Sequence, residues 1–203
     1  MRSLAVVVLG VFATPLVANA TLIFSDRTAW EGASTSVTTE DFEGQAWSVN
    51  SGDPLGSSTA INGIQFATGG TIYGVSEAVT YDAAYHTGNY LEWQPGENSL
   101  TITLPTLVTA FALDFGQFYD QASDFTFLIG GDTYSVNAPG GSYSFWGITA
   151  DTAFDTITIG TNGPFPSIDN LSYGTARVPE PSTLILLGIG VLGLGAGWRR
   201  RRI

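Results

Sequence analysis

The sequence predicts an all-β protein: a single jelly-roll-like antiparallel β-sandwich, flanked by an N-terminal signal peptide and a C-terminal transmembrane sorting helix. Three observations predict this organisation. The central region consists of short alternating or apolar runs separated by Gly, Asn, Asp and Pro, without sustained 3.6-residue periodicity. Both ends of the chain are apolar and carry arginine beside the apolar run. No cysteine occurs, so packing rather than disulfides must stabilise the domain.

The clearest strands are Ser99–Leu104, in which Leu100, Ile102 and Leu104 share a face, and Val108–Phe115, in which Phe111, Leu113 and Phe115 share one. Because only a short segment that contains Pro105 separates them, we expect the two strands to form one hairpin. One short helix is expected at Ser25–Glu31. Further strands are expected at Ile64–Ala67, Thr71–Val75, Asn89–Trp93, Phe125–Ile129, Thr133–Val136, Tyr143–Ile148, Asp155–Ile159 and Ile168–Tyr173.

Glycine pairs punctuate these runs and predict the turns between them. They occur at Gly69-Gly70, Gly130-Gly131 and Gly140-Gly141. About ten strands at a spacing of about 8 to 12 residues are typical of a sandwich and not of a repeat protein. The sequence therefore predicts one β domain over residues 21–177.

The region from Thr21 to Val178 is strongly acidic. It contains seventeen Asp and Glu, two Arg and no Lys, a formal charge of −15. Such a surface repels phosphate groups, which excludes nucleic acid as a partner. It suits an exported protein that must stay soluble, or one that holds divalent cations.

Residues 1–20 have the pattern of a secretory signal peptide. A short basic start precedes the apolar core Leu4–Val17, and Ala18 and Ala20 are the small residues that signal peptidase reads. We expect signal peptidase to cleave after Ala20, so that the mature chain begins at Thr21.

Residues 178–203 have the composition of a membrane sorting signal. A polar motif precedes the glycine-rich apolar segment 184–198, and four arginines follow it. Arginines stay on the cytoplasmic side while the apolar part enters the bilayer. The 15 apolar residues are fewer than the about 20 that a permanent spanning helix needs, which favours a transient membrane segment; an uncleaved single-pass anchor is the alternative. The motif residues are Pro179, Glu180 and Pro181, and the cluster is Arg199, Arg200, Arg201 and Arg202.

This tail resembles the PEP-CTERM sorting domain, also called the ice-binding protein C-terminal domain, of exported proteins of Gram-negative bacteria. The resemblance implies that an exosortase, a membrane-embedded transpeptidase-like enzyme, recognises Pro179, Glu180 and Pro181 and removes the tail, with Arg199–Arg202 as the stop signal. It also implies export through the inner membrane and delivery to the cell surface or outside, where exopolysaccharide is a possible partner. Segments at 98–116, 145–154 and 168–174 resemble segments of domains that precede this same tail.

Two acidic segments lie at opposite ends of the domain, at Glu40–Gly44 and Ile168–Leu171. The first and last strands of a sandwich commonly lie side by side, and a period of two places Asp169 on the inward face. A buried carboxylate needs a cation or several donors, so Asp41, Glu43 and Asp169 are candidate ligands of a structural Ca²⁺. The alternative is that these acids lie at strand ends in water. No other cofactor is indicated.

Aromatic residues among polar neighbours suggest a glycan-binding surface, because exposed rings stack on the apolar faces of sugars. Tyr85 and Tyr90 are the better surface candidates. Trp93 and Trp146 share strand faces with apolar neighbours, so we expect them in the core or at its edge.

The sequence offers no catalytic residues that we can name. His86 is the only histidine, and no nucleophile-elbow motif accompanies it. We therefore expect a non-catalytic exported surface or extracellular-matrix protein. A carbohydrate-binding module for exopolysaccharide, stabilised by calcium, is the alternative. A glycoside-active enzyme is a third hypothesis, which requires two carboxylates about 5 to 10 Å apart.

Overall fold

A computed structural model of the chain describes residues 21–49, 51–77, 88–94, 99–117, 122–140 and 142–177. The chain divides into two units, one of which is Ala20–Arg177. The predicted signal peptide and sorting tail lie outside the described residues, as does Tyr85.

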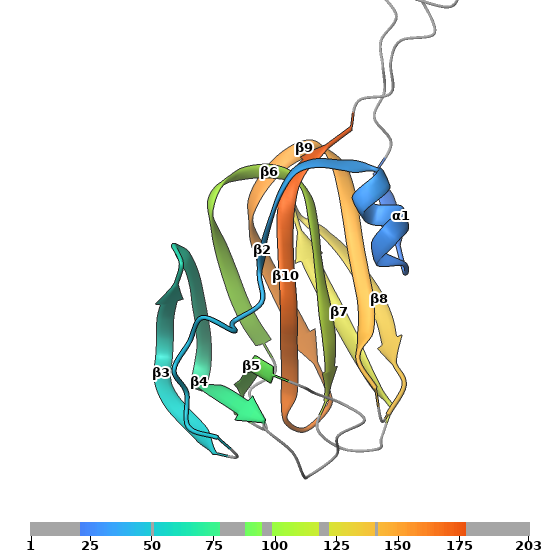
Figure 1. Cartoon of the computed structure of the whole chain (residues 1–203). Helices are drawn as coiled ribbons and strands as arrows, with labels where there is room; N and C mark the ends of the chain where they lie inside the picture. The colour runs from blue at the N-terminus through green and yellow to red at the C-terminus, as the bar shows by residue number, and fades with distance from the viewer. Residues whose placement is uncertain are drawn as a thin grey trace, which may run out of the picture. The chain divides into compact units, whose positions relative to one another are not determined.

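The described residues form ten strands and one helix (Figure 1). In chain order they are β1 Leu22–Phe24, α1 Arg27–Gly32, β2 Ser34–Glu40, β3 Gly52–Ile61, β4 Ile64–Glu77, β5 Gly88–Trp93, β6 Ser99–Gln117, β7 Ser123–Ile129, β8 Asp132–Ala138, β9 Ser144–Thr161 and β10 Pro166–Ala176.

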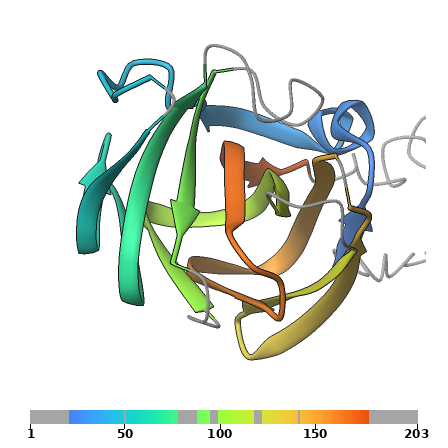
Figure 2. The same cartoon turned by 90° about the horizontal axis from the view of Figure 1, so that it is seen from below.

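The strands pair in one antiparallel network in the order β2-β10-β5-β4-β6-β9-β7-β8. Outside this path β1 pairs with β9, β3 pairs with β4, and β10 also pairs with β6. Figure 2, which views the domain from below, shows the strands arranged around a common interior. The predicted all-β, antiparallel class is confirmed, whereas the jelly-roll topology stays a prediction.

The expected hairpin at Pro105 is wrong. Residues Ser99–Gln117 form a single 19-residue strand, β6, and both of its halves pair with β9. The register shifts between Thr103 and Val108 and again before Ala110, so the strand bends there instead of reversing. Pro lacks a backbone donor, which interrupts the ladder but does not require a turn when the chain stays extended.

Gly69-Gly70 is not a turn either, because β4 continues through it. Before the pair, β4 lies opposite β6, up to Thr68 with Leu100; after it, β4 lies opposite β5, starting at Ile72 with Trp93. Glycines permit such a sharp change of partner. Gly130-Gly131 does form a tight turn, between Ile129 and Asp132, and both glycines have positive φ.

Sequence reasoning missed β1, β2 and β3. The β3–β4 hairpin closes at Asn62-Gly63, with φ of 48° and 87° and with Ile61 opposite Ile64. Asn-Gly is the strongest short hairpin signal, because both positions need positive φ. That signal was present in the sequence and identifies the hairpin.

The core lies on the inward faces of the long strands. Among the residues that the structure describes, 25 buried hydrophobic residues form one cluster, which includes Trp93, Phe115, Phe127 and Trp146. Trp146 stacks on Phe127 with ring centroids 4.1 Å apart and planes 2° apart. The core position predicted for Trp93 and Trp146 is confirmed, since they are 0% and 2% exposed.

Helix α1 covers part of the outer face of β6 and β9. Asp26 caps the helix, because its Oδ1 accepts the Ala29 N–H at 2.8 Å. Trp30 is fully buried against Ala110 and Ala112, and its indole donates to the Ile148 carbonyl at 3.1 Å. The helix begins two residues later than predicted and places Arg27 beside β10.

Candidate functional site

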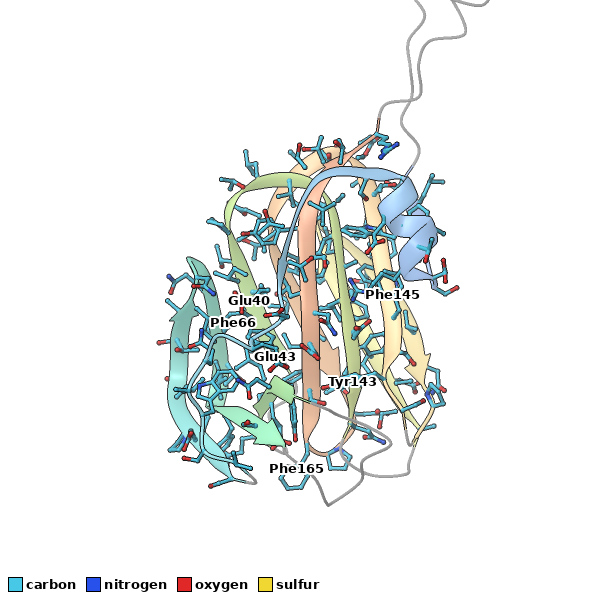
Figure 3. All side chains as sticks on the ribbon, in the orientation of Figure 1. Glu40, Glu43, Phe66, Tyr143, Phe145 and Phe165 are labelled. Atoms are coloured by element: carbon cyan, nitrogen blue, oxygen red, sulfur yellow. The ribbon has the colours of Figure 1, made fainter. Side chains whose placement is uncertain are left out.

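The two acidic segments of the sequence do lie side by side. Strand β2 pairs with β10, and Glu40 at the end of β2 lies opposite Leu171. Glu40 and Glu43 lie between β10 and the β3–β4 hairpin in the view of Figure 3. The arrangement predicted for the first and last acidic segments is therefore present.

A bulge in β10 determines where Asp169 lies. Asn170 has a φ of 48°, and the register with β6 shifts between Asp169 and Ser172. Ile168 and Leu171, three residues apart, are both fully buried. The period of two that we used to place Asp169 on the face of Leu171 is thus wrong at this position, because the bulge adds a residue.

Asp169 is half-buried among other acids. Its Oδ1 accepts the Asn170 N–H at 2.6 Å and its Oδ2 accepts from the Asn170 amide at 3.2 Å. Burial raises the pKa of Asp169 to about 7; the Asn170 hydrogen bond opposes this shift, and the charges of Asp114, Glu43 and Asp41 add to it. The carboxyl is therefore partly protonated near neutral pH.

Asp114 and Arg27 form an ion pair that sequence reasoning missed. Arg27 Nη2 lies 3.0 Å from Asp114 Oδ1, and both side chains are mostly buried. The guanidinium also donates to Ser172 Oγ at 3.1 Å and to the Asn170 carbonyl at 3.2 Å, and it lies 4.8 Å from the centre of the Phe145 ring. The one available signal was an acid between two apolar strand residues, Leu113 and Phe115.

The acids of the other segment bind neighbouring loops. Glu40 is 7% exposed; it accepts the Phe42 N–H at 2.9 Å and the Asn62 side-chain amide at 2.7 Å. Glu43 Oε1 accepts the Asn89 N–H at 2.9 Å, and Asn89 donates its side-chain amide to the carbonyls of Phe42 and Gln45. These bonds fix the segment after β2 to the β3–β4 turn and to β5.

The charges of Asp41 and Glu43 help to raise the pKa of Asp169, but in the described part of the chain the three acids are not gathered as metal ligands. Within the ranges that the structure describes, no three His, Cys, Asp or Glu side chains are arranged to hold a metal ion. Asp41 instead accepts the Glu43 N–H at 3.2 Å. Asp41 and Glu43 are exposed, as expected for acids that lie at a strand end in water, whereas Asp169 is half-buried.

Of Tyr85 and Tyr90, the two rings predicted to stack on a glycan, only Tyr90 is described by the structure, and its position does not support the prediction. Tyr90 is 2% exposed, so its expected surface position is wrong. Tyr90 lies in β5, which pairs with both β4 and β10 and is therefore internal to the sheet. Such a ring packs in the interior and cannot stack on a sugar.

These contacts, which we call the acidic network, form two groups. Arg27 and Asp114 tie α1 and β6 to β10, and Glu40 and Glu43 tie the end of β2 to the β3–β4 turn and to β5. The chemistry of the network is that of hydrogen bonds and an ion pair that hold elements together.

In the comparison with protein families, residues 177–202 match the model of the PEP-CTERM protein-sorting motif, as the sequence predicted. The match begins one residue after β10 ends at Ala176. No curated protein matches the chain. The chain is therefore an all-β protein that carries a PEP-CTERM sorting motif, which supports export and exosortase-dependent, membrane-associated sorting.

In the part of the chain that the structure describes, no helix has the length and apolar character needed to cross a bilayer. The expected apolar helix 184–198 lies outside that part.

Proposed function

We propose that this chain is a non-catalytic surface or extracellular-matrix protein whose β domain is delivered outside the cell and freed from its tail by an exosortase. In this proposal signal peptidase removes residues 1–20, segment 184–198 enters the membrane as a helix, and cleavage at Pro179–Pro181 releases a jelly-roll-like sandwich. The observation that carries the proposal is the sorting motif at residues 177–202.

The position of the motif supports processing next to a folded domain. Arg177 is the last described residue, and its N–H donates to the Ala33 carbonyl at 2.8 Å while its Nε donates to the Ser34 carbonyl at 2.9 Å. The Pro-Glu-Pro motif begins two residues later. Removal of everything beyond the motif would leave all described strands intact.

The acidic network supports a non-catalytic role. Asp41, Glu43 and Asp169 accept hydrogen bonds from backbone N–H groups, and Asp114 pairs with Arg27. We infer that these acids act in holding the fold together and not as a general acid or base.

Cell fractionation in the native host tests the proposal. Wild type is compared with a variant in which Pro179, Glu180 and Pro181 are all alanine, and with Thr175→Ala as a matched control just before the motif. We expect wild type and the control outside the cell or on its surface, and the triple variant at full length in the membrane fraction. Identical distribution of all three proteins would overturn sorting through this motif.

A further inference from the structure

One outer face of the domain is built almost entirely from uncharged, hydroxyl-bearing side chains. Thr101 of β6 lies opposite Thr158 of β9, which lies opposite Leu128 of β7, which lies opposite Thr133 of β8. The next row runs from Ser99 through Gly160 and Thr126 to Ser135. A third row pairs Thr103 with Thr156.

These residues alternate with the core residues, so their side chains project away from it. In β7, Phe125, Phe127 and Ile129 are buried, whereas Thr126 is half-buried and Leu128 is 44% exposed. In β8, Thr133 and Ser135 are exposed. The register thus gathers hydroxyls from four strands on one surface, which we call the hydroxyl face; it consists of Ser99, Thr101, Thr103, Thr126, Leu128, Thr133, Ser135, Thr156, Thr158 and Gly160.

The hydroxyl face is free of charge although the domain is not. Residues 21–178 carry a formal charge of −15, yet none of the ten residues of this face is ionisable. An anionic polymer is repelled by the domain as a whole. The uncharged hydroxyl groups of the face favour a neutral partner that is rich in hydrogen-bonding groups, and Asp124, which lies on the same side of β7 two residues before Thr126, adds a carboxylate at its edge that accepts hydrogen bonds.

A depression of about 380 Å³ lies at one end of this face, lined by Asp124, Thr126, Gly160, Thr161 and Asn162. Its walls are fixed: Asp124 N–H donates to Asn162 Oδ1 at 3.1 Å, and Asn137 donates to Asp124 Oδ1 at 2.9 Å. Gly160 adds no side chain to it. Carboxylate, amide and hydroxyl groups held in place around a recess can hydrogen-bond sugar hydroxyls without much loss of entropy.

We propose that the hydroxyl face and this depression bind a neutral polysaccharide. A sugar ring enters the depression, where Asp124 and Asn162 bond its hydroxyls, and the chain continues across the threonines of β7 and β9. This site replaces the one predicted around Tyr90. The inference rests on the proposed export, because such a polymer is met outside the cell.

Affinity electrophoresis of the full-length protein in nonionic detergent tests this. The native gels contain hydroxyethyl cellulose, laminarin, dextran or galactomannan, with alginate as the anionic comparison. We expect retardation by at least one neutral polymer and none by alginate. Thr126→Glu and, on the exposed neighbouring position, Ser135→Glu should weaken binding at least about tenfold, because each places a carboxylate where the sugar must displace water. Thr38→Glu on β2 is the matched control and should bind as wild type does.

Absence of retardation by every neutral polymer, or equal binding by all three variants, would overturn the proposal. Thermal melting identifies a variant that fails to fold. If Thr126→Glu does not fold, the binding of Ser135→Glu tests the proposal instead, because the Ser135 side chain is exposed. The outcome is independent of sorting, since the electrophoresis requires no tail processing. Failure here therefore leaves the fractionation result intact.

Discussion

At the scale of single residues, Asp169 is the group most sensitive to its surroundings. Its pKa of about 7 in the folded protein lies well above the usual 3.8. The folded state therefore binds the proton more tightly than the unfolded chain does between these values. The contribution of this group to stability is fully present below about pH 4 and is lost as the pH rises through about 7.

We expect Asp169→Asn to remove this dependence. At pH 8 the variant should be more stable than wild type by about 1 to 2 kcal/mol, a value discounted for the partial exposure of the group, and near pH 5 the difference should shrink. Urea unfolding of the full-length protein in detergent at both pH values measures it. A variant that is less stable than wild type at pH 8 would show that the charged form is favoured in the fold.

Arg27 is the second residue with a large expected effect, because one guanidinium serves Asp114, Ser172 and the Asn170 carbonyl. We expect Arg27→Ala to cost about 2 kcal/mol in free energy of unfolding. Arg27→Lys keeps the charge but loses the planar guanidinium group, so its free energy of unfolding should lie between those of wild type and Arg27→Ala. If Arg27→Ala and Arg27→Lys were both as stable as wild type in denaturant unfolding, the contacts of Arg27 would not stabilise the fold.

At the scale of elements, the pairing of β2 with β10 depends on close approach of two backbones. A Cβ placed on Gly174 would lie 2.7 Å from the Thr35 carbonyl oxygen and 3.1 Å from that of Ser36. Backbone atoms cannot move aside without breaking the ladder. The register shift between Tyr173 and Thr175 lies at the same place.

Gly174→Ala should therefore destabilise the protein by about 2 kcal/mol. Gly44→Ala is the matched control, since a Cβ there meets nothing within 4 Å, and it should change stability by less than about 0.5 kcal/mol. Chemical denaturation of both variants compares them, and equal loss in the two would remove the close contact as the cause.

The elements also show what the sequence could predict. Strands with strict alternation, such as Phe125–Ile129, were found because one face is apolar. The continuity of β6 through Pro105 was not predictable, because the two halves have opposite phases and only their shared partner β9 holds them in one strand. The bulge at Asn170 was hidden for a similar reason: the pairing with β6 determines it, and no local pattern marks it.

At the scale of the whole molecule, the distribution of charge bears on both the calcium site and the polysaccharide site. The calcium site predicted at Asp41, Glu43 and Asp169 stays a prediction: the charges of Asp41 and Glu43 reach Asp169, but the described residues hold no group of three acids arranged around a metal ion. The sequence could not give the distances between these acids or the hydrogen bonds that their carboxylate oxygens accept. The hydroxyl face escaped notice because it exists only in the register of four strands.

We expect Ca²⁺ to raise the melting temperature no more than Mg²⁺ does at equal ionic strength, because both cations screen the acidic domain in the same way. Melting with and without chelator in detergent measures this. A rise in melting temperature that is specific to Ca²⁺ and lost in Asp169→Asn would support a structural calcium site, because a ligand that binds only the folded state stabilises it by mass action.

The intact mass of the protein recovered outside the native host cell shows whether the β domain is exported and released from its tail. We predict a chain that begins at Thr21 and ends close to Pro181. A recovered chain that still contains Arg199–Arg202 would show that the tail is not removed, and the tail would then be a permanent anchor.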